Sequence, residues 1–242
     1  MMYLNERIDD LQRGGLRVIQ RADAFRFGTD AVLLADFAAP RRHDRVCDLG
    51  TGTGIIPLLL YARENTISAD AVEIQPDMAD MAARSMAMNG LNEKIRVLPG
   101  DLRSIRTLLP HARYDLVTCN PPYGKAGGTL LNPDASKRLA RHEESCAIEE
   151  VACAAAWLLQ NGGRLCCVFP AARMIELSDA MRKYRMAPKR IRMVHSRVEK
   201  AAHLCLMEGM LDARPGLIIE PPLVIYDENN AYTPELRRIY GL

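Results

Sequence analysis

The sequence of 242 residues lacks the features that mark secreted, membrane and metal-binding proteins. Its seven cysteines are odd in number and include no Cys-x-x-Cys pair and no Cys/His spacing typical of a metal site. Residues 1–10 contain three acidic residues and no apolar core, so we expect no signal peptide. No apolar run approaches the ~20 residues that span a bilayer. We therefore expect a cytoplasmic protein with reduced cysteines, no metal ion and no membrane contact.

The chain also lacks internal repeats, low-complexity tracts and an interdomain linker, which predicts a single domain. A hydrophobic content of 48% is enough for a sizeable core without disulfides. We expect residues 1–26, which are polar and rich in arginine, to form an N-terminal extension over a domain of residues 27–242. The net charge of only +2 does not by itself indicate a nucleic-acid-binding protein. A monomer is the expected state.

A glycine-rich turn follows the first predicted strand of the domain. Residues 45–48 form that strand, residues 49–54 read Leu-Gly-Thr-Gly-Thr-Gly, and a helix begins at residue 55. This succession opens a nucleotide-binding, doubly wound α/β fold. Gly54 comes one residue too early for the dinucleotide pattern G-x-G-x-x-G, and Asp48 would repel a pyrophosphate. The acid instead suits a ligand that carries an ammonium group.

The next two predicted strands each lead to an acidic residue. Glu73 ends the strand at residues 69–73, where an acid can accept two hydrogen bonds from a ribose diol. Asp101 follows the strand at residues 95–98 and could accept a hydrogen bond from the exocyclic amine of adenine. A single Asp after a strand is, however, more often a turn former.

The fourth predicted strand, residues 115–119, ends in the rigid sequence Asn120-Pro121-Pro122-Tyr123. The prolines fix their own φ angles, and Pro121 holds Asn120 extended. The Asn120 side-chain oxygen and the Pro121 carbonyl can accept both N–H bonds of a planar amine, while Tyr123 stacks on its face. A Pro-Pro turn that closes a hairpin is the alternative for this motif taken alone.

These signals all fall at the carboxyl ends of strands, which line one crevice in a doubly wound sheet. A ligand with ammonium, ribose and adenine groups is S-adenosylmethionine, which we therefore expect as the cofactor. The predicted fold is α/β, a single Rossmann-like methyltransferase domain with a seven-stranded, mostly parallel sheet. Residues 189–194 and 203–211 should form an antiparallel hairpin near its C-terminus.

Three further segments have two interpretations each. Thr29 or Asp30 could simply cap the helix at residues 31–37, or this helix N-terminus could face a ligand carboxylate. The long polar loop at residues 124–144 could be a solvated loop or a lid over the substrate. Between residues 182 and 200, eight Lys or Arg residues stand against one acid, a density that suits phosphate contacts as well as a solvated face.

From Phe27 to the C-terminus, the sequence resembles the class I S-adenosylmethionine-dependent methyltransferases. Three segments more narrowly resemble the bacterial tRNA1(Val) adenine-N6 methyltransferase family: residues 27–34 (Phe-Gly-Thr-Asp-Ala-Val-Leu-Leu), 120–123 (Asn-Pro-Pro-Tyr) and 140–143 (Ala-Arg-His-Glu). The resemblance implies methylation of the adenine just 3′ of the anticodon in tRNA. In this family an aromatic residue often follows the position of Tyr123, and Gly124-Lys125 departs from that pattern.

The site residues expected from the motifs and the resemblance fall into three groups. Those that hold the target adenine are Asn120, Pro121, Pro122 and Tyr123. The cofactor-binding residues are Phe27, Thr29, Asp48, Gly50, Thr51, Gly52, Gly54, Glu73, Ile74, Asp101, Leu102 and Asn120. The RNA-binding residues are Lys125, Arg138, Arg141, His142, Lys189, Arg190 and Arg192. We expect no dedicated general base, with His142 as the candidate against that view.

Other methyltransferases share parts of this pattern. A protein-glutamine methyltransferase would present a similar amide to Asn120, although its relatives carry a helical substrate domain for which only 47 residues precede Asp48. A DNA adenine methyltransferase would need a target-recognition domain, which we do not find. Ribosomal RNA guanine-N2 methylation and a non-catalytic cofactor- or RNA-binding module are the remaining alternatives.

Overall fold

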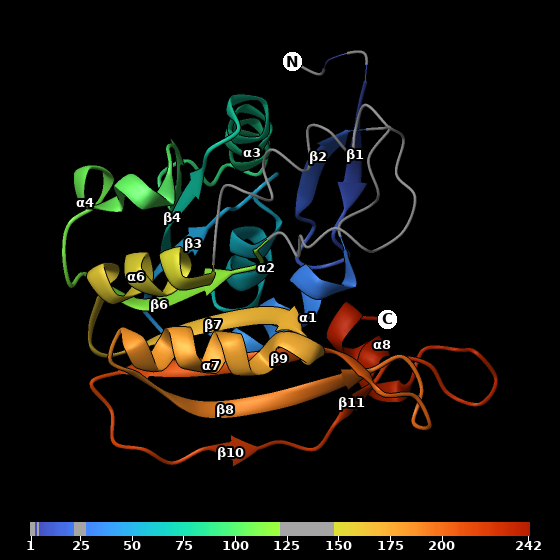
Figure 1. Cartoon of the computed structure of the whole chain (residues 1–242). Helices are drawn as coiled ribbons and strands as arrows, with labels where there is room; N and C mark the ends of the chain where they lie inside the picture. The colour runs from blue at the N-terminus through green and yellow to red at the C-terminus, as the bar shows by residue number, and fades with distance from the viewer. Residues whose placement is uncertain (1–2, 4, 22–27, 122–147) are drawn as a thin grey trace, which may run out of the picture.

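The computed structural model describes residues 3, 5–21, 28–121 and 148–242. In this part of the chain a nine-stranded sheet lies between two layers of helices (Figure 1). Its strands are β3 (Arg45–Leu49), β4 (Ser68–Glu73), β5 (Ile95–Pro99), β6 (Tyr114–Cys119), β7 (Leu159–Pro170), β8 (Met186–His195), β9 (Ala202–Leu211), β10 (Ile218–Ile219) and β11 (Leu223–Val224).

The strand order is β10-β8-β9-β7-β6-β3-β4-β5, with β11 also paired to β8. From β3 the chain winds outward through β4 and β5, then returns to β6 on the other side of β3, all in parallel. This reversal makes the carboxyl ends of β3 and β6 the topological switch point, where doubly wound sheets bind ligands. Strand β9 is antiparallel to both β7 and β8, which confirms the predicted hairpin. The seven main strands are those expected, and two-residue strands β10 and β11 extend the sheet.

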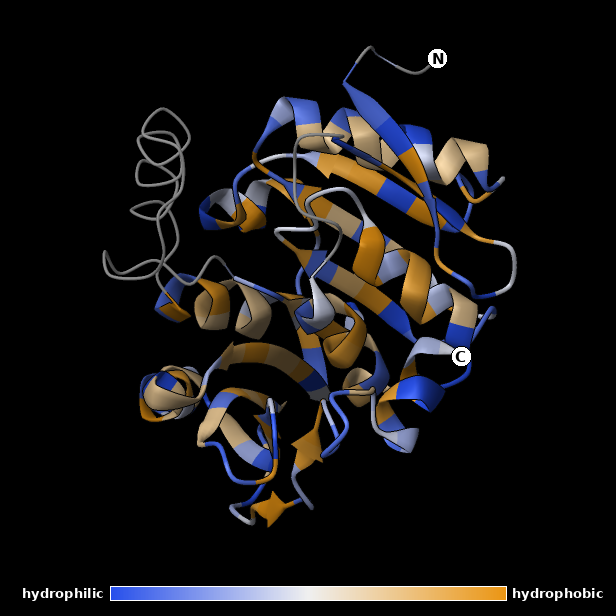
Figure 2. Cartoon of the chain, turned by 90° about the vertical axis from the view of Figure 1, so that its right-hand side faces the viewer, coloured by the Kyte–Doolittle hydropathy of each residue, from blue (hydrophilic) through white to orange (hydrophobic). Residues whose placement is uncertain are grey.

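Helices cover both faces of the sheet because the strands bury side chains on both sides. One face carries α1 (Thr29–Ala38), α2 (Ile55–Arg63), α3 (Pro76–Met88) and α8 (Pro234–Tyr240). The other carries α4 (Ile105–Leu108), α6 (Ile148–Leu158) and α7 (Met174–Lys183). Short 3₁₀ turns, η1 (Leu102–Ser104) and η2 (Ala171–Arg173), precede α4 and α7. In Figure 2, hydrophobic residues run along the strands between these helices.

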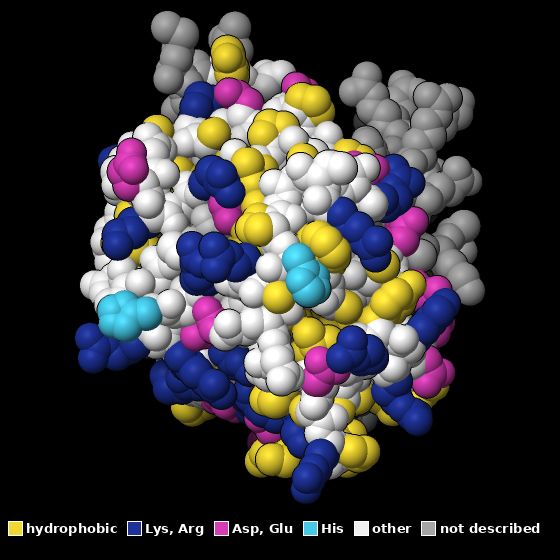
Figure 3. Space-filling view, turned by 90° about the vertical axis from the view of Figure 1, so that its left-hand side faces the viewer, with side chains coloured by type: hydrophobic (Ala, Val, Ile, Leu, Met, Phe, Trp, Pro, Cys, Tyr) yellow, Lys and Arg dark blue, Asp and Glu magenta, His cyan; other side chains and the backbone are white. Residues whose placement is uncertain are grey.

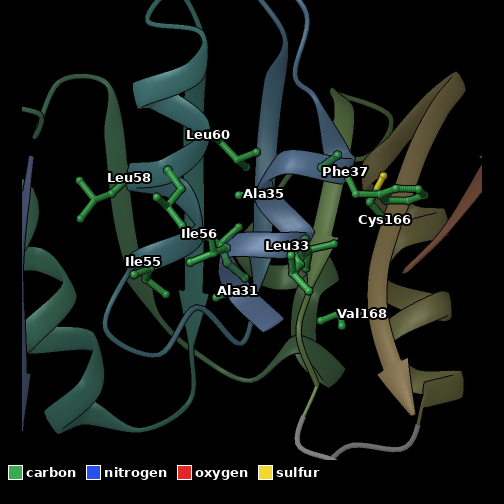
Figure 4. Packing of buried hydrophobic residues seen from close by; sticks show 14 of the residues in the cluster. Ala31, Leu33, Ala35, Phe37, Ile55, Ile56, Leu58, Leu60, Cys166 and Val168 are labelled. Carbon is green, nitrogen blue, oxygen red and sulfur yellow. The ribbon is translucent and has the colours of Figure 1, made fainter. Parts of the chain in front are cut away.

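Helices α1 and α2 anchor the first face through a cluster of buried aliphatic side chains. Leu33, Ile56 and Val168 are all buried in this cluster, and Figure 4 shows side chains from α1, α2 and β7 converging there. Burying each such side chain contributes about 1.5–3 kcal/mol. This packing fixes the N-terminal ends of α1 and α2 at the carboxyl edge of the sheet. Gly28 is the N-cap of α1, so Thr29, one of the two expected caps, is the first helical residue.

An N-terminal β-hairpin lies over α3 and was not expected from the sequence. Its strands are β1 (Glu6–Asp10) and β2 (Arg17–Arg21), and the turn contains Gly14 and Gly15 with φ of +58° and +70°. The backbone N–H of Ile19 donates to Ser85 Oγ of α3 at 2.9 Å. The hairpin is therefore fastened to the domain by specific contacts. The proposed boundary after residue 26 lies outside the described residues and stays a prediction.

Candidate methyltransferase site

The carboxyl edge of the sheet collects the four polar residues that the sequence placed at strand ends. Asp48 lies in β3, Glu73 ends β4, Asp101 follows β5 and Asn120 follows β6. Asp48 and Thr118 are register partners across β3 and β6, so Asn120 comes two residues after a direct neighbour of Asp48. Parallel pairing therefore brings the glycine-rich turn and the Asn120 tip to the switch point of the sheet.

The glycine-rich turn is fastened to the end of β4. The backbone N–H groups of Gly50 and Thr51 both donate to the Val72 carbonyl, at 2.9 and 3.0 Å. Gly50 and Gly52 have φ of +69° and +57°, and a Cβ built at either would meet no atom within 4 Å. A Cβ at Gly54 would instead approach Met86 of α3 to 2.5 Å. Two glycines thus border open space that side chains would fill, while the third allows close packing of α3.

Asp48 is a fully buried carboxyl group whose two oxygens differ in their partners. Oδ1 accepts a hydrogen bond from Thr118 Oγ1 at 2.6 Å. Among the described residues, Oδ2 and the nearby Thr51 Oγ1 have no hydrogen-bond partner. Burial raises the pKa of Asp48 to about 7, although the Thr118 hydroxyl opposes the shift. A buried acceptor of this kind is stabilised by a cationic donor, so it fits the ammonium group of S-adenosylmethionine.

Glu73 links the glycine-rich turn to the start of α3. Its Oε2 accepts the Gly52 N–H and its Oε1 accepts the Gln75 N–H, each at 2.8 Å. The side chain is held in place, yet each carboxylate oxygen keeps a second lone pair for a hydroxyl donor. Ile74, the next residue, is 41% exposed and offers an apolar surface at the same edge. A ribose diol and a flat ring therefore fit beside these two residues.

Asp101 forms a turn in the described structure, as the alternative interpretation expected. Its Oδ1 accepts a hydrogen bond from the backbone N–H of Arg103 at 2.9 Å, and its Oδ2 accepts one from Arg103 Nε at 2.8 Å. These hydrogen bonds from Arg103 lower the pKa of Asp101. Leu102 is half-buried against the core beside it. An adenine amine at Asp101 would share the carboxylate with Arg103, and the cofactor role of both residues stays a prediction.

Asn120 and the buried Pro121 are described, whereas several other expected site residues are not. The expected residues outside the described part are Phe27, Pro122, Tyr123, Lys125, Arg138, Arg141 and His142. Thr29 lies at the N-terminus of α1, and its Oγ1 accepts a hydrogen bond from the Tyr240 hydroxyl at 3.2 Å. The C-terminal helix α8 thereby helps to position the start of α1.

The three expected RNA contacts in β8 lie away from the crevice and have partners within the chain. Strands β9, β7 and β6 separate β8 from β3. Arg190 pairs with Glu208 at 3.1 Å and with Glu220 at 2.7 Å. Arg192 pairs with Glu235 at 2.8 Å, and Lys189 Nζ donates to a backbone carbonyl at 3.3 Å. These guanidinium groups tie the sheet edge to the C-terminal segment, and their role in RNA binding stays a prediction.

Two residues of the site region were missed from the sequence. Thr118 holds the buried Asp48 carboxyl, and Tyr240 reaches Thr29 from the far end of the chain. For Thr118, strand alternation could have indicated an inward side chain, because it precedes Asn120 by two residues. No local pattern indicates the contact between Tyr240 and Thr29, since 211 residues separate the two.

Within the described ranges, no group of three or more His, Cys, Asp or Glu side chains is placed to hold a metal ion. A search of the same ranges finds no helix with the length and apolar character that crossing a membrane requires.

Comparisons with known proteins agree with this architecture. Residues 22–190 match the family model of the methyltransferase small domain. The chain is 32% identical over 231 residues to a Porphyromonas gingivalis protein named tRNA1(Val) (adenine(37)-N6)-methyltransferase, covering 91% of this chain and 89% of that protein. A Tolumonas auensis protein of the same name is 34% identical, covering 88% and 86% of the two chains.

Solved structures support the fold. A crystal structure of a predicted O-methyltransferase from Agrobacterium tumefaciens superposes with a TM-score of 0.73 at 24% identity, covering 88% of this chain and 96% of the other. A geranyl diphosphate methyltransferase solved in complex with S-adenosylmethionine gives a TM-score of 0.53 at 13% identity, covering 74% and 83%. At these identities the likeness concerns the fold alone. The family-model match and the curated relatives carry the assignment: the chain belongs to the S-adenosylmethionine-dependent methyltransferases of the small-domain family, among the tRNA1(Val) (adenine(37)-N6)-methyltransferases.

Proposed function

We propose that this protein methylates N6 of the adenine just 3′ of the anticodon in a tRNA, the position numbered 37 in the names of its relatives. The observation that carries the proposal is the register of β3 and β6, which brings Asn120 next to the turn that fits the cofactor. We further propose that it acts in the cytoplasm as a monomer. Ribosomal RNA and protein glutamine are less favoured substrates, because the curated relatives carry the tRNA name.

In this proposal the cofactor is held by charge and by hydrogen bonds from the strand ends. Asp48 Oδ2 and Thr51 Oγ1, which lack partners among the described residues, bind the ammonium group. Glu73 accepts hydrogen bonds from the ribose hydroxyls, and the turn at Gly50 and Gly52 leaves room for close approach. S-adenosylmethionine supplies an electrophilic methyl group.

Asn120 orients the amine that receives the methyl group. The N6 lone pair of adenine is delocalised into the ring, so the amine is a poor nucleophile. Acceptance of its two N–H bonds by the Asn120 side chain and the Pro121 carbonyl favours a pyramidal nitrogen and frees the lone pair for in-line attack. Orienting the reactants in this way can lower the activation barrier by about 7–11 kcal/mol. The proton then leaves to water, because the methylated nitrogen is acidic.

The target base must leave its stack to reach Asn120 at the switch point. Unstacking costs a few kcal/mol and is easiest for an unpaired base, so a single-stranded loop such as the anticodon loop suits the site. At saturating cofactor we expect kcat to be flat between about pH 6 and 8, as no residue titrates in the methyl transfer. A histidine-like inflection that His142→Ala abolishes would assign a base instead.

The experiment measures transfer of a labelled methyl group to an unmodified anticodon stem-loop with adenine or guanine at the target position. We expect transfer only to the adenine form, and we expect Asn120→Ala to abolish it while cofactor binding persists. Asn229→Ala, a substitution at an exposed asparagine away from the crevice, is the matched control. Transfer to the guanine form, or to a glutamine peptide and no RNA, contradicts the proposal.

A further inference from the structure

A second pocket lies at the opposite, amino-terminal edge of the sheet. It has a volume of about 400 Å³ and is lined by residues that precede or begin β3, β4, β5 and β6. Arg45 begins β3, and Asp48 with the glycine-rich turn lies at the other end of that strand. A five-residue strand is about 13 Å long. The pocket is therefore separate from the crevice, and the methyltransferase chemistry does not use it.

The lining of this amino-edge pocket is strongly basic for a chain of low net charge. Four cations, Arg45, Lys94, Arg96 and Arg113, face two carboxylates, Asp70 and Glu93. The lining alone thus carries the +2 of the entire chain. Figure 3 looks onto this edge and shows Lys and Arg side chains spread over it among Asp and Glu side chains. Such a local excess attracts anions.

The carboxylate of Asp70 is already used within the pocket wall. Its Oδ1 accepts a hydrogen bond from Arg96 Nε at 2.7 Å, and its Oδ2 accepts one from the Tyr114 hydroxyl. The side chains of Arg45, Lys94 and Arg113 are exposed and have no ion-pair or hydrogen-bond partner among the described residues. Three cations are thus available to a ligand, with Glu93 as the only carboxylate of the lining that has no partner in the described part of the chain.

The backbones that carry these three cations are hydrogen-bonded to other parts of the domain. The Arg45 N–H donates to Asp115 Oδ2 at 2.8 Å. The backbone N–H of Lys94 donates to the Leu91 carbonyl at 2.9 Å, and the backbone N–H of Arg113 donates to the Leu158 carbonyl at 2.9 Å. A ligand would therefore order only side chains, and the smaller entropy loss favours binding.

We propose that the amino-edge pocket binds a phosphate-bearing ligand through Arg45, Lys94 and Arg113. Guanidinium and ammonium groups are the usual partners of phosphate, and arginine can bind it in a bidentate manner. The aromatic side chain of the lining, Tyr114, is buried and its hydroxyl donates to Asp70, so the lining offers no exposed ring to stack on a base and the recognised group is the phosphate. The phosphate belongs either to a small free ligand or to the backbone of a bound RNA.

The test compares two double variants with the wild type. The pocket variant combines Arg45→Gln and Arg113→Gln, and a control of equal charge combines Arg214→Gln and Arg237→Gln. The control arginines are exposed and lie outside the pocket. Isothermal titration with inorganic pyrophosphate should show binding to the wild type and the control. The pocket variant should bind at least about tenfold more weakly, since two charge-assisted contacts are lost. Equal pyrophosphate binding to all three proteins excludes a small free ligand, and the proposal then depends on the tRNA titration below.

A second arm distinguishes the two sources of phosphate by titrating unmodified tRNA at several salt concentrations. If tRNA affinity is equal in all three proteins while pyrophosphate binding depends on the pocket, the ligand is a free one. If the pocket variant alone loses tRNA affinity, with a salt slope smaller by roughly 1 per cation removed, the phosphate is that of RNA. If neither pyrophosphate nor tRNA distinguishes the variants, the proposal fails.

Two controls separate this outcome from misfolding and from the proposed function. Cofactor binding should persist in both variants, because the substituted residues lie outside the crevice. Lys94→Gln, a single change in an exposed turn, repeats the pyrophosphate test if the double variant is unstable. The pyrophosphate arm needs no methyl transfer, so it can succeed or fail whatever RNA the enzyme modifies.

Discussion

Replacing the buried Asp48 by Asn should make the protein more stable at neutral pH while weakening cofactor binding. The pKa of Asp48 rises from an ordinary 3.8 to about 7, chiefly because the carboxyl is fully buried. At pH 5 the folded form holds its proton while the unfolded chain has lost it, so the stability of the wild type falls as pH rises toward 7. Between pH 5 and pH 8 this difference in protonation lowers the free energy of unfolding of the wild type by about 2–3 kcal/mol.

Urea unfolding of the wild type and Asp48→Asn at pH 5 and pH 8 measures this difference. Other titrating groups are common to both proteins and cancel in the comparison. The wild type should lose about 2–3 kcal/mol more than the variant over this interval. Titration calorimetry at pH 8 should show S-adenosylmethionine binding to the wild type and at least about tenfold weaker binding to the variant. Identical pH dependence of unfolding would show that the carboxylate is already well compensated without cofactor, and the reasoning would be wrong.

Three further substitutions test other parts of the structure. Arg164→Met should destabilise the protein by about 3–5 kcal/mol in urea unfolding, because it removes the only ion-pair partner of the buried Asp44 in the described part of the chain and leaves the buried Glu208 with Arg190 alone; a loss below 1 kcal/mol would show that the remaining hydrogen bonds of these carboxylates suffice. Glu73→Gln should weaken cofactor binding about tenfold in calorimetry and cost about 1–3 kcal/mol of stability, since the amide keeps one acceptor while its NH2 group faces the other backbone N–H; unchanged affinity would remove Glu73 from the site. Ser85→Ala leaves the buried Ile19 N–H unpaired, costing about 1–3 kcal/mol; hydrogen exchange confined to the hairpin should quicken, and unaltered exchange would argue against the contact.

The sheet could be predicted from the sequence because its signals are local. The glycine-rich turn after a short apolar strand, and the acid or amide after each following strand, depend only on neighbouring residues. Strands joined by helices pair in parallel, so their carboxyl ends meet at one edge. Asp48, Glu73 and Asn120 were placed correctly at that edge for this reason. Their roles in binding stay predictions.

The remaining features depend on contacts between distant parts of the chain. The Lys and Arg residues between positions 182 and 200 suggested phosphate contacts, but the acids that pair with Arg190 and Arg192 lie up to 43 residues further along the chain than their partners. The N-terminal hairpin was missed although Gly14-Gly15 is a turn signal. Its strands are too polar for a clear alternation and gain their order from α3. The amino-edge pocket is formed by four separate strands and has no linear signature.

The most direct test of the proposed reaction is nucleoside mass spectrometry of unmodified bulk tRNA incubated with the protein and S-adenosylmethionine. We expect new N6-methyladenosine with the wild type and with Asn229→Ala, and none with Asn120→Ala. Cofactor binding, measured in parallel, should persist in all three proteins. Absence of any methylated nucleoside while the cofactor binds, or a methylated base other than adenine, would contradict tRNA adenine-N6 methylation.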